Sequence, residues 1–301
     1  MPTLRNKVAL ITGAALGIGA GTARALAREG VKLVLIDLDA TPLNALAHEL
    51  GEDTVLARVA DVCDLPALQS AVDAGVEKFG GIDFVLVNAG ITSYGSVLNV
   101  DPATFKRVID VNMLGAFHTV RAALPAVIER KGYILVVSSL AAFAAAPGLA
   151  AYCATKAGVE QFANALRLEV THRGVAVGSA HMAWIDTPLV QDAKADLTAF
   201  NQLLAVLPGP LGKTTSVEAC VDAFVSALAG RKRRVYVPQW VGPLGWLKAL
   251  VTSPLADRRI LPHIPRILPL MDREVAQLGR STSSRNVALE NGAAEPAEDS
   301  K

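Results

Sequence analysis

The amino-acid sequence predicts an α/β protein with a doubly wound parallel sheet of about seven strands, flanked by helices on both faces. Short apolar runs alternate with segments of helical pattern between residues 7 and 240, and this alternation is typical of buried parallel strands joined by crossover helices. Polar or glycine residues directly follow the strand runs, at the edge where parallel sheets bind ligands. These residues are Gly13, Asp37, Asp61, Asn88 and Ser139.

The individual elements follow from the same pattern. The predicted strands are residues 7–12, 33–36, 55–59, 84–87, 133–137, 175–180 and 235–237. The predicted helices are residues 20–28, 41–50, 64–80, 101–130, 151–172 and 215–228. Asp64 is a candidate N-cap with Pro66 in the first turn of its helix, and residues 215–218 (TSVE) have the spacing of a capping box.

Residues 1–240 are therefore predicted to form one domain. From about residue 241 the periodicity is lost, and proline recurs too often for one long helix. We interpret residues 241–280 as an extension that covers a pocket, packs against another subunit or lies on a membrane surface. Residues 281–301 contain no aromatic side chain and little apolar periodicity, which predicts a disordered tail.

Composition excludes several classes of protein. The chain has 301 residues and a formal net charge of +1, so it has no overall attraction for nucleic acid. Its apolar fraction of 51% is rich in alanine, and we find neither an uninterrupted apolar run of membrane-spanning length nor a signal-peptide pattern. Three scattered cysteines indicate reduced thiols in a cytoplasmic protein, and five unclustered histidines predict no metal site.

A glycine-rich loop, GAALGIG at 13–19, lies between the first strand and the first helix. Such a loop brings the backbone close to a pyrophosphate at a helix N-terminus, whereas the alternative is an Ala/Gly-rich helix cap. Asp37 lies eighteen residues after Gly19, near the usual distance for an acid that hydrogen-bonds an adenosine ribose. Because its carboxylate would repel a 2′-phosphate, NAD is preferred over NADP; the alternative is an unrelated acid after a strand.

Two further strand ends complete the predicted cofactor site. Asp61 suits a contact with adenine, although a capping role is the alternative. Asn88-Ala89-Gly90 lets the backbone pass close to a cofactor, whereas the alternative is an ordinary turn.

A candidate acid–base pair lies in the predicted helix 151–172. Tyr152 and Lys156 are four residues apart and so share one helix face. A cation near a phenol lowers the pKa of the phenol, which can then act as a general acid or base. The spacing also occurs by chance on many helices. Cys153 beside the pair is a redox group or, in the simpler interpretation, a small packing residue.

These features together resemble the short-chain dehydrogenase/reductase family. The resemblance rests on TGAALGIG (12–19), NAG (88–90), Asn112, Ser139 and the Tyr152–Lys156 pair, in order and spacing over about residues 5–240. It implies a Rossmann-type fold and hydride transfer between a nicotinamide and a carbon that bears oxygen. Without the resemblance, Asn112 would be interpreted as an exposed or satisfied polar residue within a helix.

The resemblance also implies a role for each site residue. Ser139 would hold the substrate oxygen, Tyr152 would donate or accept its proton, Lys156 would bind the nicotinamide ribose and lower the pKa of Tyr152, and Asn112 would hold a water in the proton relay. The predicted cofactor contacts are Gly13, Ala15, Leu16, Gly17, Ile18, Gly19, Asp37, Asp61, Val62, Asn88, Ala89, Gly90, Tyr152, Lys156, Ile185 and Thr187.

The sequence departs from the family pattern after the sixth strand. Met182-Ala183 replaces the usual Pro-Gly pair where the backbone meets the nicotinamide. This change removes a rigid turn, so the position and exchange of the cofactor are less well defined by the sequence than the catalytic set.

The expected substrate wall is mostly apolar and contains no Arg or Lys placed for a carboxylate or phosphate. It comprises residues 91–94, 140–146, Trp184 and the loop 188–212. We therefore expect an NAD(P)-dependent oxidoreductase for a hydrophobic secondary alcohol or ketone (steroid-, terpenoid- or lipid-like). The alternative is a catalytically silent NAD-binding sensor or scaffold. The resemblance implies a homodimer or homotetramer packed through residues 102–130 and 151–172, and weak membrane-surface contact through residues 240–278 is a further expectation.

Overall fold

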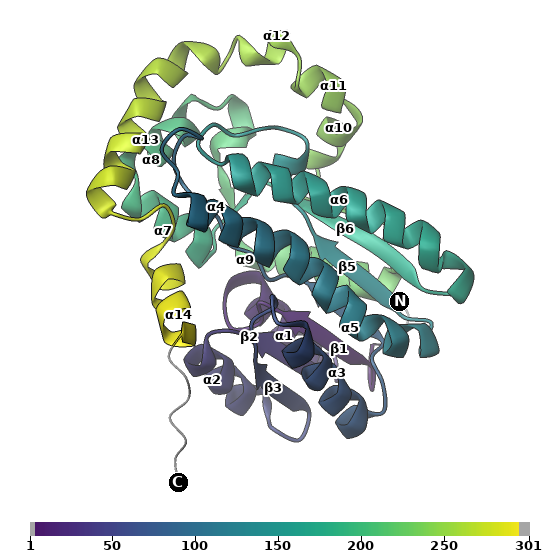
Figure 1. The fold of residues 1–301 in the computed structure, drawn as a ribbon. Coiled ribbons are helices and arrows are strands. Elements are labelled where there is room, and N and C mark those ends of the chain that lie inside the picture. Colours follow the sequence, from purple (N-terminus) through teal and green to yellow (C-terminus); the bar gives the residue numbers. More distant parts are fainter. Residues whose placement is uncertain (1–3, 295–301) are drawn as a thin grey trace.

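A seven-stranded parallel sheet forms the centre of the protein in the computed structural model, which describes residues 4–294 (Figure 1). The strand order is β3-β2-β1-β4-β5-β6-β9, so the chain winds outward from β1 in both directions. This is the predicted Rossmann-type fold. The strands are β1 Val8–Thr12, β2 Lys32–Asp37, β3 Val55–Val59, β4 Phe84–Val87, β5 Tyr133–Val137, β6 Ala176–Met182 and β9 Arg234–Val237.

Helices cover both faces of the sheet and form a separate core on each face. α1, α2 and α9 pack on one face, and α3, α5 and α6 pack on the other. The bounds are α1 Gly17–Arg28, α2 Ala40–Leu50, α3 Leu65–Phe79, α4 Pro102–Ile109, α5 Gly115–Glu129, α6 Ala150–Val170 and α9 Val217–Gly230. Successive residues of β1 alternate between the two cores, with Ala9 and Ile11 on the first and Val8 and Leu10 on the second. The strand is apolar throughout because both of its faces are buried.

The helix starts agree with the sequence prediction at two positions and differ at a third. Asp64 caps α3 by accepting a hydrogen bond from Ala67 N at 3.0 Å, and Asp101 caps α4 in the same way. The predicted capping box at residues 215–218 is wrong, since the N-cap of α9 is Ser216. Thr215 is instead part of β8 (Thr214–Thr215), which pairs with β7 (Trp184–Ile185).

The long helix predicted over residues 101–130 is continuous but contains a π-helical turn. This turn, Asp110–Leu114, joins α4 to α5. The whole of Pro102–Glu129 is long and apolar enough, by length and composition, to cross a membrane, but 56% of its most apolar window is buried inside the fold. The core helix of a soluble protein passes the same test, so the finding is weak evidence for a membrane span.

A helical cap lies over the carboxyl ends of the strands. Its helices α7 and α8 pack against α13 in a third apolar cluster. The chain between β9 and α13 forms an arch of short helices above them (Figure 1). These elements are α7 Pro188–Asp196, α8 Thr198–Val206, α10 Val241–Trp246, α11 Lys248–Val251, α12 Pro254–Asp257 and α13 Ile264–Leu278.

The expectation of a disordered tail from residue 281 is wrong for the part that the structure describes. Ser281, Thr282 and Ser283 are buried, and α14 covers Ser284–Ala294. These polar residues are ordered by hydrogen bonds to other segments rather than by apolar periodicity, which is why their composition misled the prediction. Residues 295–301 lie outside the described residues.

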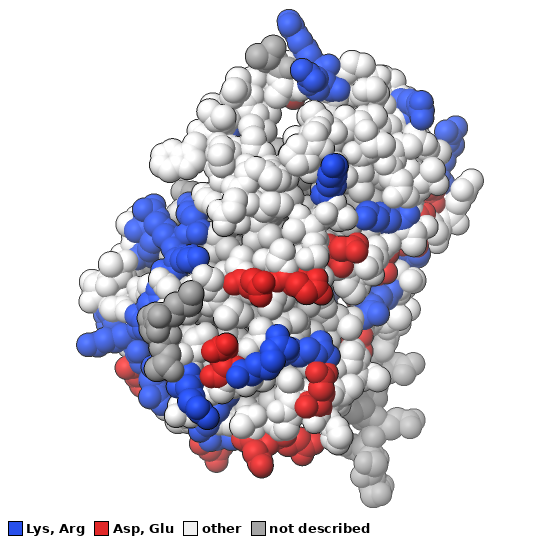
Figure 2. Space-filling view, turned by 180° about the vertical axis from the view of Figure 1, so that it is seen from behind, with Lys and Arg blue, Asp and Glu red and all other residues white. Residues whose placement is uncertain are grey.

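Both signs of charge are mixed over part of one face of the molecule. Lys and Arg alternate with Asp and Glu across the lower half of the face shown in Figure 2. This mixture agrees with the net charge of +1.

A buried histidine in β6 makes the stability of the fold sensitive to acid. His181 is 0% exposed and stacks on Phe143 with ring centroids 4.6 Å apart. Its Nε2 lies 2.9 Å from Ser179 Oγ, while Nδ1 has no hydrogen-bond partner among the described residues. Burial, together with the nearby Arg234, lowers the pKa of His181 to about 3.

We therefore expect the free energy of unfolding to fall as the pH drops below about 6.5. In this range His181 binds a proton in the unfolded state but stays neutral in the folded state. The expected slope is about 1.4 kcal/mol per pH unit, or roughly 2 kcal/mol between pH 6.5 and 5. Urea unfolding at both pH values tests this. His181→Gln should lose this part of the pH dependence, whereas the exposed His172→Gln should keep it; an unchanged slope in His181→Gln contradicts the assignment.

Candidate active site

One cavity of about 740 Å³ lies at the carboxyl edge of the sheet and continues beneath the cap. Most of the predicted site residues line it, as expected for groups that follow neighbouring parallel strands. They are Gly13, Leu16, Gly17, Ile18, Asp37, Asp61, Val62, Asn88, Ala89, Gly90, Ser139, Tyr152, Lys156, Ile185 and Thr187. Ala15, Gly19 and Asn112 are not part of the lining.

The glycine-rich loop is packed too tightly for side chains. Gly13 has a φ of +63°, and a Cβ on Gly19 would lie 2.0 Å from Gly13 O. Leu16, the N-cap of α1, supplies no side-chain hydrogen bond to the first turn. The helix N-terminus therefore presents uncapped N–H groups at the cavity, the arrangement that suits a pyrophosphate.

Asp37 ties the end of β2 to this loop. Its Oδ2 accepts a hydrogen bond from Ala15 N at 2.9 Å, and its Oδ1 accepts one from Asp39 N at 3.0 Å. Burial raises the pKa of Asp37 above its ordinary value, and these hydrogen bonds oppose the rise. The carboxyl group is thus fixed at the cavity wall.

Asp61 has its carboxylate oxygens engaged within the protein. Oδ1 accepts from Cys63 N at 2.8 Å, and Oδ2 accepts from Arg107 Nη2 at 2.7 Å. Burial raises the pKa of Asp61, but hydrogen bonds from Cys63 and Arg107 outweigh it and leave the pKa below its ordinary value. An adenine that bound to Asp61 would have to use carboxylate oxygens that already accept hydrogen bonds from Cys63 and Arg107.

Asn88 and Asn112 support the loops around the cavity. Asn88 Nδ2 donates to Thr12 O at 3.0 Å and Gly13 O at 2.9 Å, which joins the ends of β4 and β1. Asn112 is buried in the π-helical turn, where Oδ1 accepts from Ile91 N at 2.8 Å and Nδ2 donates to Thr155 Oγ1 at 3.0 Å. The Asn112 side chain thus holds the backbone after the NAG segment rather than facing the cavity.

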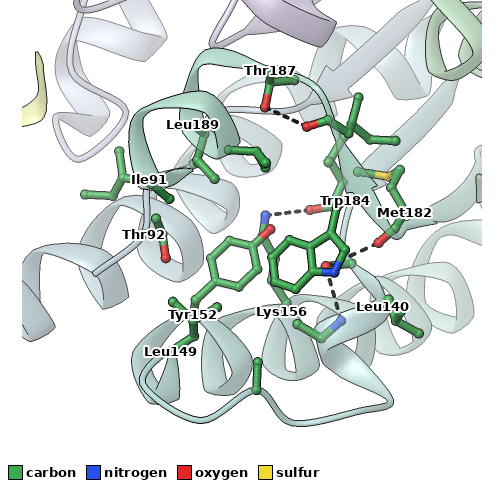
Figure 3. A pocket seen from close by; sticks show the side chains of 18 of the residues that line it. Ile91, Thr92, Leu140, Leu149, Tyr152, Lys156, Met182, Trp184, Thr187 and Leu189 are labelled. Atoms are coloured by element: carbon green, nitrogen blue, oxygen red, sulfur yellow. Dashed lines mark hydrogen bonds between the residues drawn. The ribbon is translucent and has the colours of Figure 1, made fainter. Parts of the chain in front are cut away.

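Ser139, Tyr152 and Lys156 line the same cavity, and Figure 3 shows Tyr152 and Lys156 there. Ser139 Oγ accepts from Ala141 N at 3.1 Å and lies 3.4 Å from Met182 O. Lys156 Nζ donates to Val137 O at 3.0 Å and lies 5.5 Å from the centre of the Tyr152 ring. The helical spacing of four residues therefore brings the phenol and the ammonium together, as predicted.

Burial sets the proton affinities of this pair. It raises the pKa of Tyr152 to about 12, against a lowering contribution from a hydrogen bond with Ser139. It also lowers the pKa of Lys156 to about 8. The net lowering of the Tyr152 pKa expected from the resemblance is therefore not found, because the cost of burying a phenolate is larger than the favourable contacts. Burial also raises the pKa of the Cys153 thiol, which favours its interpretation as a packing residue.

The segment that lacks Pro-Gly continues the sheet instead of turning sharply. β6 extends to Met182, and Ala183 N donates to Val237 O at 2.8 Å. Trp184 is fixed by a hydrogen bond from Nε1 to Leu211 O at 2.9 Å and by an edge contact with Phe200. Regular backbone pairing therefore replaces the rigid turn.

The far part of the cavity is mainly apolar and includes residues that sequence reasoning missed. The predicted walls are present, with Leu140, Trp184 and Phe200 among them. The segments expected to form the substrate wall contribute no Arg or Lys to the lining, but the arch adds Arg259 and Asp257 from outside them. The sequence of the extension has no helical period, so it did not indicate which of its residues would line the cavity. The additional lining residues are Leu149 and, from the extension, Leu244, Val251, Thr252, Ala256, Asp257, Arg259 and Ile260. The C-terminal segment adds Ser283, Arg285, Asn286, Leu289 and Glu290 elsewhere in the lining.

The fold and the site define a class of protein, an oxidoreductase built on a dinucleotide-binding sheet. The cavity joins a pyrophosphate-type loop to a hydroxyl, phenol and ammonium cluster and then to an apolar chamber. Among residues 4–294, no group of three or more His, Cys, Asp or Glu is placed to hold a metal ion. The arrangement can orient a dinucleotide beside an oxygen-bearing carbon and move a proton at that oxygen.

Comparison with known proteins identifies the family. The model of the short chain dehydrogenase family matches residues 7–198, and the chain belongs to this family. An uncharacterised NAD-dependent oxidoreductase of Mycobacterium tuberculosis is 36% identical over 206 residues, covering 63% of this chain and 75% of the relative. A trans-4-hydroxycyclohexanecarboxylate dehydrogenase of Sinomonas cyclohexanicum is 34% identical over 225 residues, covering 72% and 83%. The crystal structure of a 3-ketoacyl-(acyl-carrier-protein) reductase from Brucella melitensis complexed with NADH is similar, with 31% identity, a TM-score of 0.70 and coverage of 78% and 97%.

Proposed function

We propose that the protein interconverts a hydrophobic secondary alcohol and its ketone with NAD(H) as the hydride carrier. The observation that carries this proposal is the position of Tyr152 and Lys156 in one cavity, between the glycine-rich loop and the apolar chamber. The names of the Mycobacterium relative and the Brucella structure, which mention NAD and NADH, support the choice of cofactor.

The residues that line the cavity fit a dinucleotide. The uncapped start of α1 would hold the pyrophosphate, Asp37 the adenosine ribose, and the segment with Ile185 and Thr187 the nicotinamide amide. When bound, the nicotinamide accepts or supplies a hydride. We also propose that Asp37 favours NAD over NADP, because a fixed carboxylate repels a 2′-phosphate.

The proton is handled by this chain's own side chains. Ser139 Oγ holds the substrate oxygen, and the Tyr152 hydroxyl takes its proton during oxidation or returns it during reduction. When Lys156 Nζ is protonated, its positive charge near the Tyr152 ring stabilises the phenolate. Asn112 supports the relay by fixing Ile91, whose N–H it accepts at 2.8 Å and to whose carbonyl it donates at 2.9 Å.

The apolar chamber supports a bulky substrate. Leu149, Phe200 and Leu203 lie in the third apolar cluster and in the cavity wall. The Sinomonas relative is named for a substrate with a hydroxyl and a carboxylate on a cyclohexane ring, and we take only the ring as support for this proposal. We therefore expect cyclic or steroid-like alcohols to fit better than small polar ones.

A substrate panel tests the function. We expect purified protein with NAD to oxidise bulky apolar secondary alcohols with kcat/KM at least about tenfold above small polyols, the discrimination of one or two buried methylene groups. The change in NADH absorbance measures this. Faster turnover of polyols contradicts the substrate class, and tightly held NAD without turnover of any alcohol or ketone favours a sensor.

We further propose a homo-oligomer that packs through α4–α5 and α6 and is located in the cytoplasm. The exposed apolar side chains Leu114, Phe117 and Leu168 on these helices support such an interface. Light scattering of the protein in solution checks the mass. The exposed Trp246, Leu247 and Leu250 of the arch support the weaker proposal of contact with a membrane surface.

A further inference from the structure

The C-terminal helix lies at the end of the cavity where the adenosine would bind. Arg285, Asn286, Leu289 and Glu290 of α14 line the same cavity as Asp37. Figure 1 shows α14 in yellow beside α2, far along the chain from the strands that form this edge. The C-terminal segment thus closes a side of the cleft that the sheet leaves open.

Hydrogen bonds to three residues of the segment between β4 and α4 hold the start of α14 in place. Ser281 O accepts from Tyr94 N at 2.7 Å, and Ser281 Oγ accepts from Asp101 N at 3.0 Å. Thr282 Oγ1 donates to Thr92 O at 2.8 Å. Ser281 and Thr282 are 3% and 2% exposed, so the segment is built into the fold rather than resting on it.

Charged contacts fix the helix itself against the cofactor side. Arg285 Nη1 lies 3.5 Å from Asp39 Oδ2, two residues after Asp37. Glu290 Oε1 lies 3.4 Å from Arg107 Nε, and Arg107 in turn holds Asp61. The α14 helix is therefore linked to the loops that follow both β2 and β3.

The same segment is also attached to the substrate cap. Arg280 pairs with Asp196 of α7 through two contacts of 2.8 Å. Paired Arg–carboxylate contacts of this geometry are among the stronger ion pairs. One stretch of chain, residues 280–290, consequently joins the substrate cap to the adenosine end of the cavity.

We propose that residues 283–290 form a wall of the adenosine subsite, with Leu289 as the apolar surface against the adenine and the Arg285–Asp39 pair beside the ribose. This inference rests on the proposed binding of NAD(H). The dinucleotide then enters and leaves only when α14 moves aside, so α14 slows its release. The ligand class recognised by this wall is an adenine nucleotide, not the nicotinamide half.

The release rate of NADH tests the wall. In stopped-flow fluorescence with ADP-ribose as the displacing ligand, a chain ending at residue 283 should release NADH about tenfold faster than the full chain, and Leu289→Ala should give a smaller increase in the same direction. The affinity for ADP-ribose should fall by a similar factor. The affinity for reduced nicotinamide mononucleotide, which lacks the adenosine, should stay within about twofold of the full chain.

Matched controls separate this proposal from loss of the fold. Arg273→Ala removes an exposed arginine of α13 outside the cavity and should leave NADH release unchanged, whereas Arg285→Ala should accelerate it. If the shortened chain fails to fold, Leu289→Ala and Arg285→Ala decide alone. Unchanged NADH release in these variants overturns the proposal that α14 is a wall of the adenosine subsite. A loss of affinity for the mononucleotide as large as that for ADP-ribose overturns it as well. A full-length chain that binds no NADH overturns the proposed function instead.

Discussion

Tyr152→Phe is expected to lower kcat for alcohol oxidation about a thousandfold while the fold and the binding of NADH are largely retained. A positioned general acid or base contributes roughly 10²–10⁴-fold to a rate. The substitution removes the hydroxyl but keeps the ring that packs against the third apolar cluster. Steady-state rates, with binding followed by NADH fluorescence, measure the effect.

Tyr133→Phe is the matched control for this prediction. Tyr133 is also buried, but its hydroxyl donates to Lys232 O at 2.7 Å, outside the cavity. We expect this variant to keep its kcat and to lose about 1 kcal/mol of stability, the usual contribution of one hydrogen bond. Equal kcat values for Tyr152→Phe and wild type would remove Tyr152 from the proposed mechanism.

Asp37→Asn is expected to raise the ratio of kcat/KM for NADP to that for NAD about a hundredfold. Two like charges about 4 Å apart near a protein surface repel by roughly 4 kcal/mol, and Asp39 remains nearby to limit the gain. The amide oxygen can still accept the hydrogen bond from Ala15 N, whereas the hydrogen bond from Asp39 N is lost because the amide nitrogen is a donor. Initial rates with both cofactors measure the ratio.

Asp73→Asn removes the same charge from the exposed face of α3 and serves as the control. We expect its NADP-to-NAD ratio to match wild type. An Asp37→Asn variant with an unchanged ratio would show that another group sets the cofactor preference.

The sheet and the centre of the site could be predicted because local signals determine them. Buried parallel strands must be apolar on both faces, so runs such as residues 133–137 can be recognised as strands from the sequence. Parallel strands also end at one edge, which brings Gly13, Asp37 and Ser139 to one cavity although they are far apart in the chain.

The C-terminal contribution could not be predicted because its order depends on distant partners. Ser281 and Thr282 are buried and form hydrogen bonds to residues in the range 92–101. Periodicity in the tail sequence does not predict such long-range contacts. The π-helical turn that buries Asn112 likewise depends on packing against Ile91 and Thr155. Burial also reversed the expected pKa direction of Tyr152, an effect that spacing alone cannot reveal.

The attachment of the chain's end to both sides of the cavity has a consequence for protein synthesis. A ribosome makes residues 280–290 after the whole of the sheet edge that they cover. A nascent or prematurely terminated chain can complete the seven-stranded sheet while Arg280 and Arg285 are still missing, so Asp196 and Asp39 remain without these partners. Under the proposed role of α14, a chain that ends before residue 280 would therefore hold the cofactor less tightly than a chain that includes this segment.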